Sequence, residues 1–454
     1  MAPVAPALAL HHLALRSPQP EALSAFYVDL FHLPIVRRQP HGLWLGLGSA
    51  VLMIERAGPD EPPVSPQDLA LIAFAVTPED QVRLRARLAE RGVTVESETA
   101  WTLYFRDPDG RRLGVSTYPL PTTETRVLTA TGAPGDEAVA EAAARLRLNQ
   151  VVAFPTETVY GLGGNALDAE AVARIFAAKA RPADNPLIVH VADLDGVWGF
   201  AEVDDRARAL AEAFWPGPLS MVLPLRAGVM VPAAAGLNTV AVRVPAHPVA
   251  LALVRAAGVP IAAPSANRSG RPSPTTAAHV LADLGGRIPL IVDGGPCTLG
   301  IESTVVGLFA DGVRVLRPGA IAAEAIADVL GTPVGLEVGS RQAPGTRHPH
   351  YRPRAPVILV SPHVSEAALA DLHAAIAPDA GRICTRSRPA APHRFRPDAA
   401  ALARHLYADL RDLEGAPLIL VEGLHGAAAV MERLGRAASQ TLHNDAEAAW
   451  FVVD

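Results

Sequence analysis

The chain has 454 residues, of which 50% are hydrophobic and 19% are charged, and its net charge at pH 7 is -6. This length predicts several domains, and the composition excludes a wholly disordered chain because each domain can bury a core. The negative net charge gives no support to general nucleic-acid binding, although a local basic cavity is compatible with it.

The sequence shows no signal for export or for a membrane span. Its first twelve residues lack a basic segment followed by a sustained apolar stretch, and no later run of about 18 uncharged apolar residues follows. We therefore expect a cytoplasmic protein with no membrane contact. Cys297 and Cys384 are too far apart in sequence to build a disulfide framework or a cysteine-rich metal site, so we expect two buried, small hydrophobic residues.

The first 120 residues contain two weak repeats of one strand, one helix and further strands. Hydrophobic patterning predicts strands over 8–17, 44–48 and 50–56 around a helix over 20–33, then strands over 69–76, 93–97 and 101–118 around a helix over 78–92. Asp107-Pro108-Asp109-Gly110 is typical of a hairpin turn in the second repeat.

This repeat resembles the vicinal-oxygen-chelate (VOC) family, which includes glyoxalases and bleomycin-resistance proteins. The resemblance places the family's four metal ligands at His12, Glu55, Leu71 and Gly114. Leucine and glycine side chains cannot coordinate a metal, so we expect no complete metal centre. We expect this domain to be an accessory binding or interaction module. His12 and Glu55 are then an ordinary pair of residues on a strand face. A glyoxalase-like activity of this domain is an alternative.

Alternating strands and helices predict an α/β multidomain protein. We expect a VOC-like domain of βαβββ repeats over 1–121, and a second domain over 122–333 built as a twisted open α/β sheet. A turn-rich linker over 334–355 and a small α/β domain over 356–454, which resembles a Rossmann-like half-sheet, complete the chain. Gly423 and Gly426 alone are a weak dinucleotide signal.

Polar motifs follow apolar strands in the second domain. The stretch over 155–163, Pro-Thr-Glu-Thr-Val-Tyr-Gly-Leu-Gly, predicts a turn where glycines let backbone amides approach an anion, although an ordinary capped turn has the same composition. Lys179 is the only lysine of the chain, and Arg181 follows it in a loop after a helix. Both cations suit a triphosphate, and the alternative is two solvated charges at a helix end.

Further polar residues share strand faces. Thr239 and Arg243 are separated by an even number of residues on an apolar strand, as are Ser265 and Asn267 after another strand. An arginine inside an apolar strand requires a partner, and a bound anion is one explanation. Ser273, Ser303 and Arg317 add two hydroxyls and a guanidinium.

Five ordered motifs lead to a second resemblance. They are Pro-Thr-Glu-Thr-Val-Tyr-Gly-Leu-Gly (155–163), Lys179-x-Arg181, Pro-Ser-Ala-Asn (264–267), Glu-Ser-Thr-Val-Val (302–306) and Leu-Arg-Pro-Gly (316–319). Together they resemble the YrdC-type threonylcarbamoyl-AMP synthases over 126–319. The linker and the last domain are similar to those of the longer family members.

The resemblance implies that L-threonine, bicarbonate and ATP form threonylcarbamoyl-AMP, diphosphate and water, for the threonylcarbamoyladenosine modification of tRNA. It implies Mg²⁺ on the ATP phosphates, without protein ligands, and catalytic roles for Lys179 and Arg181. Mapped onto this sequence, the family's ATP contacts fall on Lys179, Arg181, Asn185, Thr239, Ser265, Asn267, Ser273, Arg317 and Tyr351. The L-threonine contacts fall on Thr158, His190, Arg243, Ala263 and Ser303.

Downstream threonylcarbamoyl transferase proteins are the expected partners by analogy, together with a weak contact to RNA. One alternative is another adenylating enzyme on the same domain, such as the hydrogenase-maturation proteins, but their cysteine-rich segments have no counterpart in a chain with two cysteines. A second alternative is a non-catalytic module that binds double-stranded RNA through its backbone.

Overall fold

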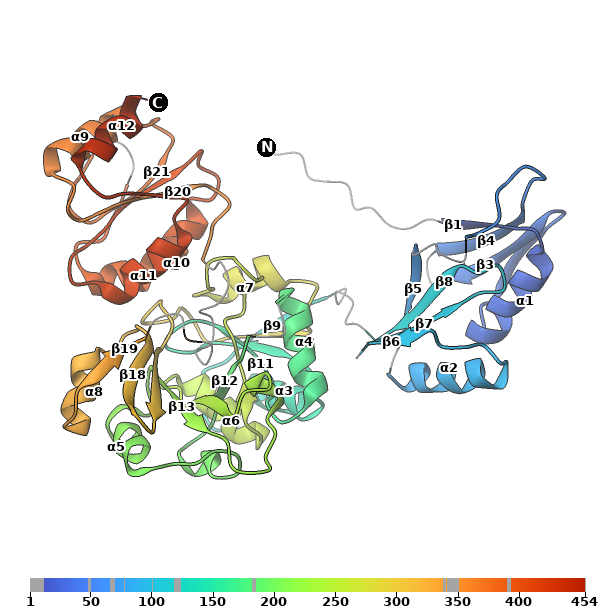
Figure 1. The fold of residues 1–454 in the computed structure, drawn as a ribbon, viewed down its shortest axis with the longest axis horizontal. Coiled ribbons are helices and arrows are strands. Elements are labelled where there is room, and N and C mark those ends of the chain that lie inside the picture. Colours follow the sequence, from blue (N-terminus) through green and yellow to red (C-terminus); the bar gives the residue numbers. More distant parts are fainter. Residues whose placement is uncertain are drawn as a thin grey trace. The chain divides into compact units, whose positions relative to one another are not determined.

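The protein was analysed as a computed structural model that describes residues 12–47, 50–65, 70–76, 78–99, 101–117, 124–181, 185–337, 340, 351–389 and 393–453. Its contacts divide the chain into two compact units, Met1–Leu120 and Pro121–Asp454 (Figure 1). None of the helices in these residues is long and apolar enough to cross a membrane.

Unit 1 consists of two copies of one topology. The first copy contains β1 (His12–Ser17), α1 (Pro20–Phe31), β2 (Ile35–Gln39), β3 (Gly42–Leu47) and β4 (Ala50–Arg56). The second contains β5 (Leu71–Ala75), α2 (Pro78–Glu90), β6 (Ser97–Glu98), β7 (Thr102–Arg106) and β8 (Arg112–Ser116). The strand orders β1-β4-β3-β2 and β5-β8-β7-β6 correspond, with the first strand of each copy parallel to the last. The predicted repeat is therefore confirmed.

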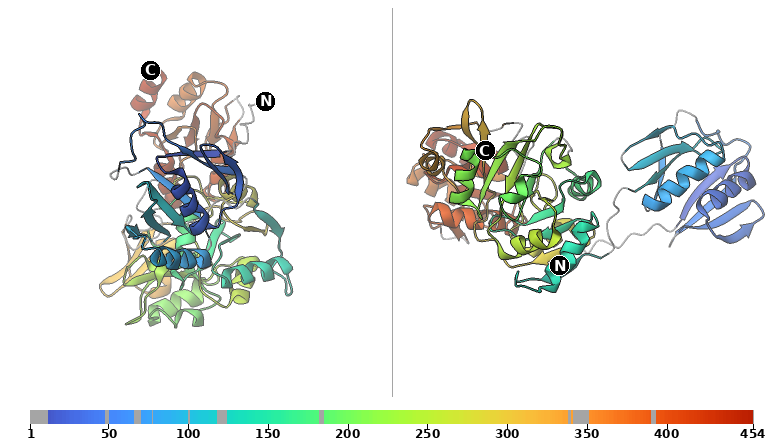
Figure 2. Two further views of the ribbon diagram at one scale, coloured as in Figure 1. Left: turned by 90° about the vertical axis from the view of Figure 1, so that its right-hand side faces the viewer. Right: turned by 90° about the horizontal axis from the view of Figure 1, so that it is seen from below.

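Two details of the predicted repeat are wrong. Strand β2 was not predicted, because its side chains are mostly exposed and it lacks an apolar face. The strand predicted over 93–97 shrinks to β6, since only Ser97 and Glu98 pair with β7. Helices α1 and α2 contact each other (Figure 2). Their buried side chains Leu23, Tyr27 and Leu88 belong to one hydrophobic cluster with side chains of the strands.

The register of β1 and β4 separates the two retained VOC positions. His12 lies opposite Val51, whereas Glu55 lies opposite Arg16, so the two residues are offset by four positions along parallel strands. At about 3.3 Å per residue this offset is roughly 13 Å. Glu55 instead forms an ion pair with Arg16 at 3.1 Å. His12 and Glu55 are therefore strand residues on one face of the sheet, as expected, but they are not neighbours.

Unit 2 contains a mixed sheet of eleven strands in the order β19-β18-β17-β13-β14-β12-β15-β11-β10-β16-β9. These strands are β9 (Arg126–Thr129), β10 (Val152–Phe154), β11 (Gly161–Asn165), β12 (Ile188–His190), β13 (Leu219–Pro224), β14 (Thr239–Arg243), β15 (Ile261–Ala262), β16 (Leu290–Asp293), β17 (Thr304–Phe309), β18 (Gly312–Arg317) and β19 (Val334–Leu336). Strand β19 occupies the start of the segment predicted to be a linker, so the sheet extends further than expected.

Helices cover both faces of this sheet (Figure 1). One buried cluster contains side chains of α3 (Glu137–Arg147) and α6 (Pro248–Ala257). The other contains side chains of α4 (Ala169–Lys179), α5 (Asp205–Phe214), α7 (Ala277–Leu284) and α8 (Ala323–Leu330). The twisted open sheet with helices on both faces that the sequence predicted is present.

The glycine-rich stretch after Tyr160 forms β11, a strand inside the sheet, and not only the predicted turn. Glycine usually weakens a strand, but here it lets side chains of the neighbouring strands approach the backbone closely. A Cβ atom on Gly163 would lie 2.7 Å from the ring of Phe154 and 2.8 Å from the side chain of Ile261. The glycines therefore bring β10, β11 and β15 together, and the polar residues that precede them reach one end of the sheet.

The last part of unit 2 is a five-stranded sheet in the order β22-β21-β23-β20-β24, and all its strand pairs are parallel. Its elements are β20 (Val357–Val360), α9 (Glu366–Ala375), β21 (Gly381–Cys384), β22 (Arg394–Phe395), α10 (Ala399–Asp412), β23 (Ile419–Glu422), α11 (Ala428–Ala437), β24 (Gln440–Leu442) and α12 (Asp445–Val453). Helices α10 and α11 cover one face, and α9 and α12 cover the other (Figure 1). The predicted Rossmann-like α/β domain is confirmed.

Candidate active site

A pocket at the ends of the central strands brings together most of the predicted site residues. Its cavity volume is about 660 Å³, including the open mouth. The predicted residues that line it are Thr158, Arg181, His190, Arg243, Ala263, Ser265, Asn267, Ser273, Ser303, Arg317 and Tyr351. Residues from separate strands and loops therefore form one polar site.

Arg243, at the end of β14, organises one side of the pocket. Its guanidinium donates hydrogen bonds to the Thr158 hydroxyl at 3.0 Å and to the Gly217 carbonyl oxygen at 3.1 Å, and it lies 2.7 Å from the Glu157 carboxylate. Although burial alone raises the pKa of Glu157, the charge of Arg243 lowers it below the usual value. This side of the pocket thus holds a buried, oriented guanidinium, a group that binds carboxylates.

His190 lies opposite Arg243 in the register between β12 and β14. Burial, together with the nearby charge of Arg243, lowers the pKa of His190 to about 3. The imidazole is therefore neutral at physiological pH, and its buried Nδ1 has no hydrogen-bond partner in the described part of the protein. A neutral ring with one unsatisfied nitrogen is suited to contact a polar ligand but is a poor base.

Lys179 lies behind another wall of the pocket. Its buried ammonium donates to the backbone carbonyl oxygens of Ser265 and Asn267, the second at 2.6 Å. Burial, and then the charge of Arg181, lower the pKa of Lys179 well below its usual value. Ala180, with φ of 52°, ends α4 in the left-handed region, and this turn separates Lys179 from Arg181, which lines the pocket.

The hydroxyl-rich side of the pocket is built around Ser303 and Arg317. The Arg317 guanidinium donates to the Ser303 carbonyl oxygen at 2.9 Å and to the Ser303 hydroxyl at 3.1 Å. The Ser303 hydroxyl also lies 2.8 Å from that of Ser220. Two strand ends thereby place a second guanidinium and a hydroxyl beside the same cavity.

Glu302 connects this pocket with the C-terminal sheet. Its buried carboxylate accepts hydrogen bonds from the hydroxyl of Ser273 at 2.5 Å and from that of Tyr407 in α10 at 2.9 Å. Arg433 of α11 lies 3.2 Å away through Nε and is fully buried. The two domains of unit 2 therefore meet through a charged pair next to the pocket.

Tyr351 joins the same contact from the linker. Its ring stacks on Tyr407 with a centroid distance of 5.3 Å and an interplanar angle of 28°. Tyr351 has φ of 69°, which is rare for a residue with a Cβ atom, and the next amide donates to the Gly270 carbonyl oxygen at 2.9 Å. Tyr351 is thus held at the pocket in a costly backbone conformation, which is a frequent feature of functional sites.

The buried carboxylate of Glu302 makes the stability of the folded protein depend on pH. Burial alone raises the pKa of Glu302, but Arg433 and Arg317 lower it below the usual value. In acid the folded protein therefore binds fewer protons than the unfolded chain. The ionised Glu302 carboxylate contributes to the free energy of unfolding above about pH 4.3, the pKa of glutamate in the unfolded chain, and this contribution is lost as the pH falls through the pKa in the folded protein. We expect the Tm of Glu302→Gln to fall less steeply than that of wild type between pH 5 and pH 3. Parallel Tm curves for the two proteins in thermal melts would contradict this.

Three predicted ATP residues do not line the pocket in this structure. They are Lys179, Asn185 and Thr239, although Lys179 contacts the backbone of two lining residues. The Thr239 hydroxyl is buried and has no hydrogen-bond partner in the described residues, which leaves it available to a ligand. Thr239 and Arg243 share β14, as predicted, but only Arg243 reaches the pocket.

Sequence reasoning assigned no role to several residues that the site uses. Glu157 and Glu302 stand inside quoted motifs, so each could have been found as the carboxylate expected beside a buried arginine. Tyr407 and Arg433 had no such signal, because they lie more than 100 residues from Glu302 in the sequence.

The fold and the pocket define the class of the protein: an α/β protein with a polar pocket that three arginines, Arg181, Arg243 and Arg317, line. The family model of the Sua5, YciO and YrdC proteins, described as telomere recombination, matches 144–319. The model of the threonylcarbamoyl-AMP synthase C-terminal domain matches 321–439, and that of the glyoxalase, bleomycin-resistance protein and dioxygenase superfamily matches 9–115.

Known proteins cover both parts of unit 2. Threonylcarbamoyl-AMP synthase of Bacillus subtilis is 50% identical over 232 residues, which make up 49% of this chain and 67% of that protein. The Schizosaccharomyces pombe synthase is 41% identical over 346 residues, covering 63% and 85% of the two chains. The structure of Pyrococcus abyssi Sua5 complexed with L-threonine has a TM-score of 0.65 at 41% identity and covers 70% of this chain and 100% of its own. The chain belongs to the threonylcarbamoyl-AMP synthase family, and it carries a glyoxalase-type domain at its N-terminal side.

Proposed function

We propose that this protein makes threonylcarbamoyl-AMP from L-threonine, bicarbonate and ATP, releasing diphosphate and water, and that tRNA modification consumes the product. The observation that carries the proposal is the single pocket with Arg243 on one side and Arg181 and Arg317 on the others. One guanidinium suits an amino-acid carboxylate, and the others suit a polyphosphate. The L-threonine complex of the similar Sua5 structure supports the first assignment.

The threonine subsite in this proposal contains Thr158, His190, Arg243, Ala263 and Ser303. Arg243 binds the carboxylate, because its guanidinium is already oriented by Thr158 and Glu157. His190 remains neutral, since its pKa is lowered to about 3, and it accepts or donates a hydrogen bond without removing a proton. The ATP subsite contains Arg181, Ser265, Asn267, Ser273, Arg317 and Tyr351, with Lys179, Asn185 and Thr239 behind it.

The reaction requires positioning and charge stabilisation and no covalent intermediate on the protein. The threonine nitrogen forms a bond to the carbon of bicarbonate with loss of water, and a carbamate oxygen then attacks the α-phosphorus while diphosphate leaves. Arg181 and Lys179 stabilise the charge that develops on the leaving group. The substrate amine must lose its proton before it attacks, and the structure offers no well-placed base among the described lining residues.

In this proposal the magnesium ion arrives on ATP and takes no ligand from the protein. Glu302 is the only carboxylate among the described lining residues, and Ser273, Tyr407 and Arg433 already engage it. Hard cations of this kind often bind through substrate phosphates and water, with few protein ligands. Bound Mg²⁺ would neutralise phosphate charge, while the protein's own arginines hold the remaining oxygens.

The proposal is tested by measuring diphosphate release from ATP by the full chain with magnesium and bicarbonate, with and without L-threonine. We expect release that depends on threonine and is weaker with serine. Absence of release under every condition would instead favour the binding module for double-stranded RNA. Threonine-independent ATP hydrolysis would contradict the assignment of the amino-acid subsite.

Arg243→Lys tests the threonine subsite directly. Lysine keeps the positive charge but loses the planar fork, so it cannot hold Thr158, Glu157 and a carboxylate together. We expect the KM for L-threonine to rise about 10- to 100-fold, which corresponds to the loss of a charged hydrogen bond, and the KM for ATP to change much less. The matched control is Arg382→Lys, because Arg382 is a buried arginine of β21, 139 positions after Arg243, that donates to the backbone carbonyl oxygen of Ala380. Equal changes in both KM values would contradict the assignment.

A further inference from the structure

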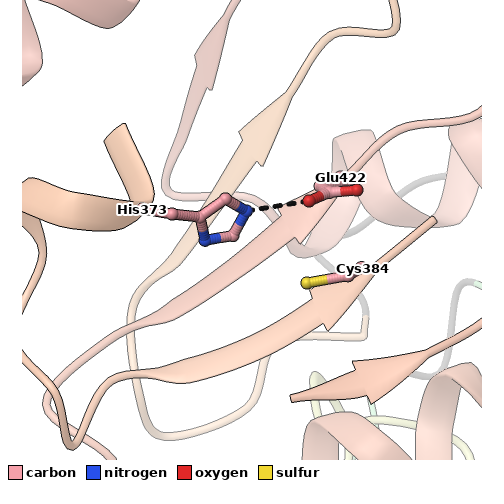
Figure 3. A group of neighbouring side chains, drawn as sticks. All are labelled: His373, Cys384 and Glu422. Atoms are coloured by element: carbon pink, nitrogen blue, oxygen red, sulfur yellow. Dashed lines mark hydrogen bonds and ion pairs between the residues drawn. The ribbon is translucent and has the colours of Figure 1, made fainter. Parts of the chain in front are cut away.

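Three metal-ligand side chains meet in the C-terminal sheet, outside the pocket described above. His373 extends from α9, Cys384 is the last residue of β21, and Glu422 is the last residue of β23 (Figure 3). A ring nitrogen, the sulfur and a carboxylate oxygen lie within 4.8 Å of one another. The carboxyl ends of parallel strands are where α/β sheets commonly bind ligands.

Glu422 carries a buried negative charge. Its Oε2 accepts hydrogen bonds from the amides of Thr385 at 2.8 Å, Arg386 at 2.7 Å and Ser387 at 3.1 Å. Its Oε1 lies 2.8 Å from His373 Nε2 and also accepts from the Ser387 hydroxyl. Within the described residues, no lysine or arginine forms an ion pair with this carboxylate, and His373 is its only ion-pair partner. Buried charges are usually paired or bound to a metal.

The donor set has a chemical preference. Sulfur and imidazole nitrogen favour zinc and similar transition ions over magnesium or calcium. A thiolate and a carboxylate together carry two negative charges, which a divalent cation would cancel inside the buried site. In tetrahedral zinc geometry the donor atoms would be about 3.4 to 3.6 Å apart. That spacing lies between the present 2.8 Å of the His373 and Glu422 atoms and the 4.8 Å limit of the group.

The arrangement does not match a nucleophilic triad of cysteine, histidine and acid. In such a triad one imidazole nitrogen contacts the acid and the other contacts the nucleophile. Here His373 Nε2 faces Glu422 and lies 3.0 Å from the Ser387 hydroxyl, whereas Nδ1 is buried without a partner in the described residues. Metal binding through Nε2 is therefore the better interpretation of the cluster.

We propose that His373, Cys384 and Glu422 bind one zinc-type divalent cation, with the hydroxyl of Ser387 or a water in the fourth position. The cation replaces the thiol proton of Cys384, which is released to solvent, and the imidazole proton moves to Nδ1. The three backbone amides orient Glu422 as outer-shell partners. Because His373 Nδ1 has no hydrogen-bond acceptor among the described residues, we expect the site to bind the cation about 10- to 100-fold more weakly than a site whose histidine has one.

The site would have a structural role that does not depend on the proposed synthase activity. It would join α9 to the ends of β21 and β23 and fix the loop over 385–387 that follows Cys384. The cluster supplies three protein ligands and leaves the fourth position to Ser387 or a water. Because the three side chains come from α9, β21 and β23, a bound cation would link these elements. Metal loading should consequently raise the Tm of the protein.

The test is a titration of the full chain, stripped with a chelator, first with Co²⁺ and then with Zn²⁺. We expect one Co²⁺ per chain with the near-ultraviolet absorption of a cobalt thiolate, displacement of that band by Zn²⁺, and a higher Tm. Cobalt bound at surface histidines lacks this band, so its absence in wild-type protein would overturn the proposal.

The chain offers a matched control, because it contains one other buried cysteine, Cys297. Cys384→Ser should lose the band, whereas Cys297→Ser should retain it. Loss in Cys297→Ser or retention in Cys384→Ser would also overturn the proposal. If Cys384→Ser fails to fold, as judged by circular dichroism, His373→Gln provides the second variant, and it should bind Co²⁺ at least 10-fold more weakly.

Discussion

Lys179→Met is expected to lower kcat for threonine-dependent diphosphate release by about 100- to 1000-fold, the loss typical when one donor to developing transition-state charge is removed. Methionine has a similar length and suits the buried position, so the main chemical change is the loss of the ammonium group. In the structure this group is held by the carbonyl oxygens of Ser265 and Asn267. We expect the polyphosphate of ATP to compete for it.

A purely structural role of Lys179 would give a different pattern. It would lower the Tm and raise the KM for ATP while leaving kcat nearly unchanged, so steady-state kinetics and a thermal melt separate the two roles. The chain also permits a direct measurement, because Lys179 is its only lysine. Lysine labelled with ¹⁵N gives one side-chain signal, and its pKa should rise when ATP binds, since phosphate charge opposes the burial that now lowers it. An unchanged pKa would contradict contact with the phosphates.

Arg433→Met is expected to destabilise unit 2 by about 3 to 5 kcal/mol, because it removes the ion-pair partner of the buried Glu302 carboxylate. The same change should reduce activity although Arg433 does not line the pocket. Glu302 also binds Ser273, and Tyr407 stacks on Tyr351, so disorder at Glu302 reaches two predicted ATP contacts. Denaturant unfolding and the KM for ATP measure the two effects.

The matched control is Arg436→Met on the same helix. Arg436 is partly exposed and pairs with Glu432 one turn away, a type of pair worth only about 0.3 to 0.5 kcal/mol. The double variant Arg433→Met/Glu302→Gln should recover part of the lost stability, since it removes the buried charge as well as its partner. Additive losses in the double variant would show that the two side chains do not stabilise each other.

Local patterns predicted the larger elements of the fold well. The strand of Thr239–Arg243 and the helix ending at Lys179 are present where apolar periodicity and the following prolyl loop placed them. Strand β11 was missed because its five residues include three glycines, which by composition favour a turn. Only the surrounding side chains, which leave no space for a Cβ atom at Gly163, explain why that segment is a strand.

In the candidate site, too, the sequence predicted some features and only the structure showed others. Motif spacing named Arg243, Ser303 and Arg317, and the structure brings all three to one pocket. Spacing also suggested that Lys179 and Arg181 face the same cavity. The structure places Lys179 behind the wall instead, because the left-handed turn at Ala180 redirects the chain between them. Their roles in catalysis remain predictions.

By itself, the sequence determined the family, the α/β class and the residue types of the pocket, because these depend on short motifs and on apolar periods within single elements. Only the tertiary structure decided which charges meet. Glu302 and Arg433 lie 131 positions apart in the sequence. His373 and Glu422 lie 49 positions apart. No local pattern connects the members of either pair. The free energy of burying a charge favours such pairs in space, whichever segments of the chain supply the partners.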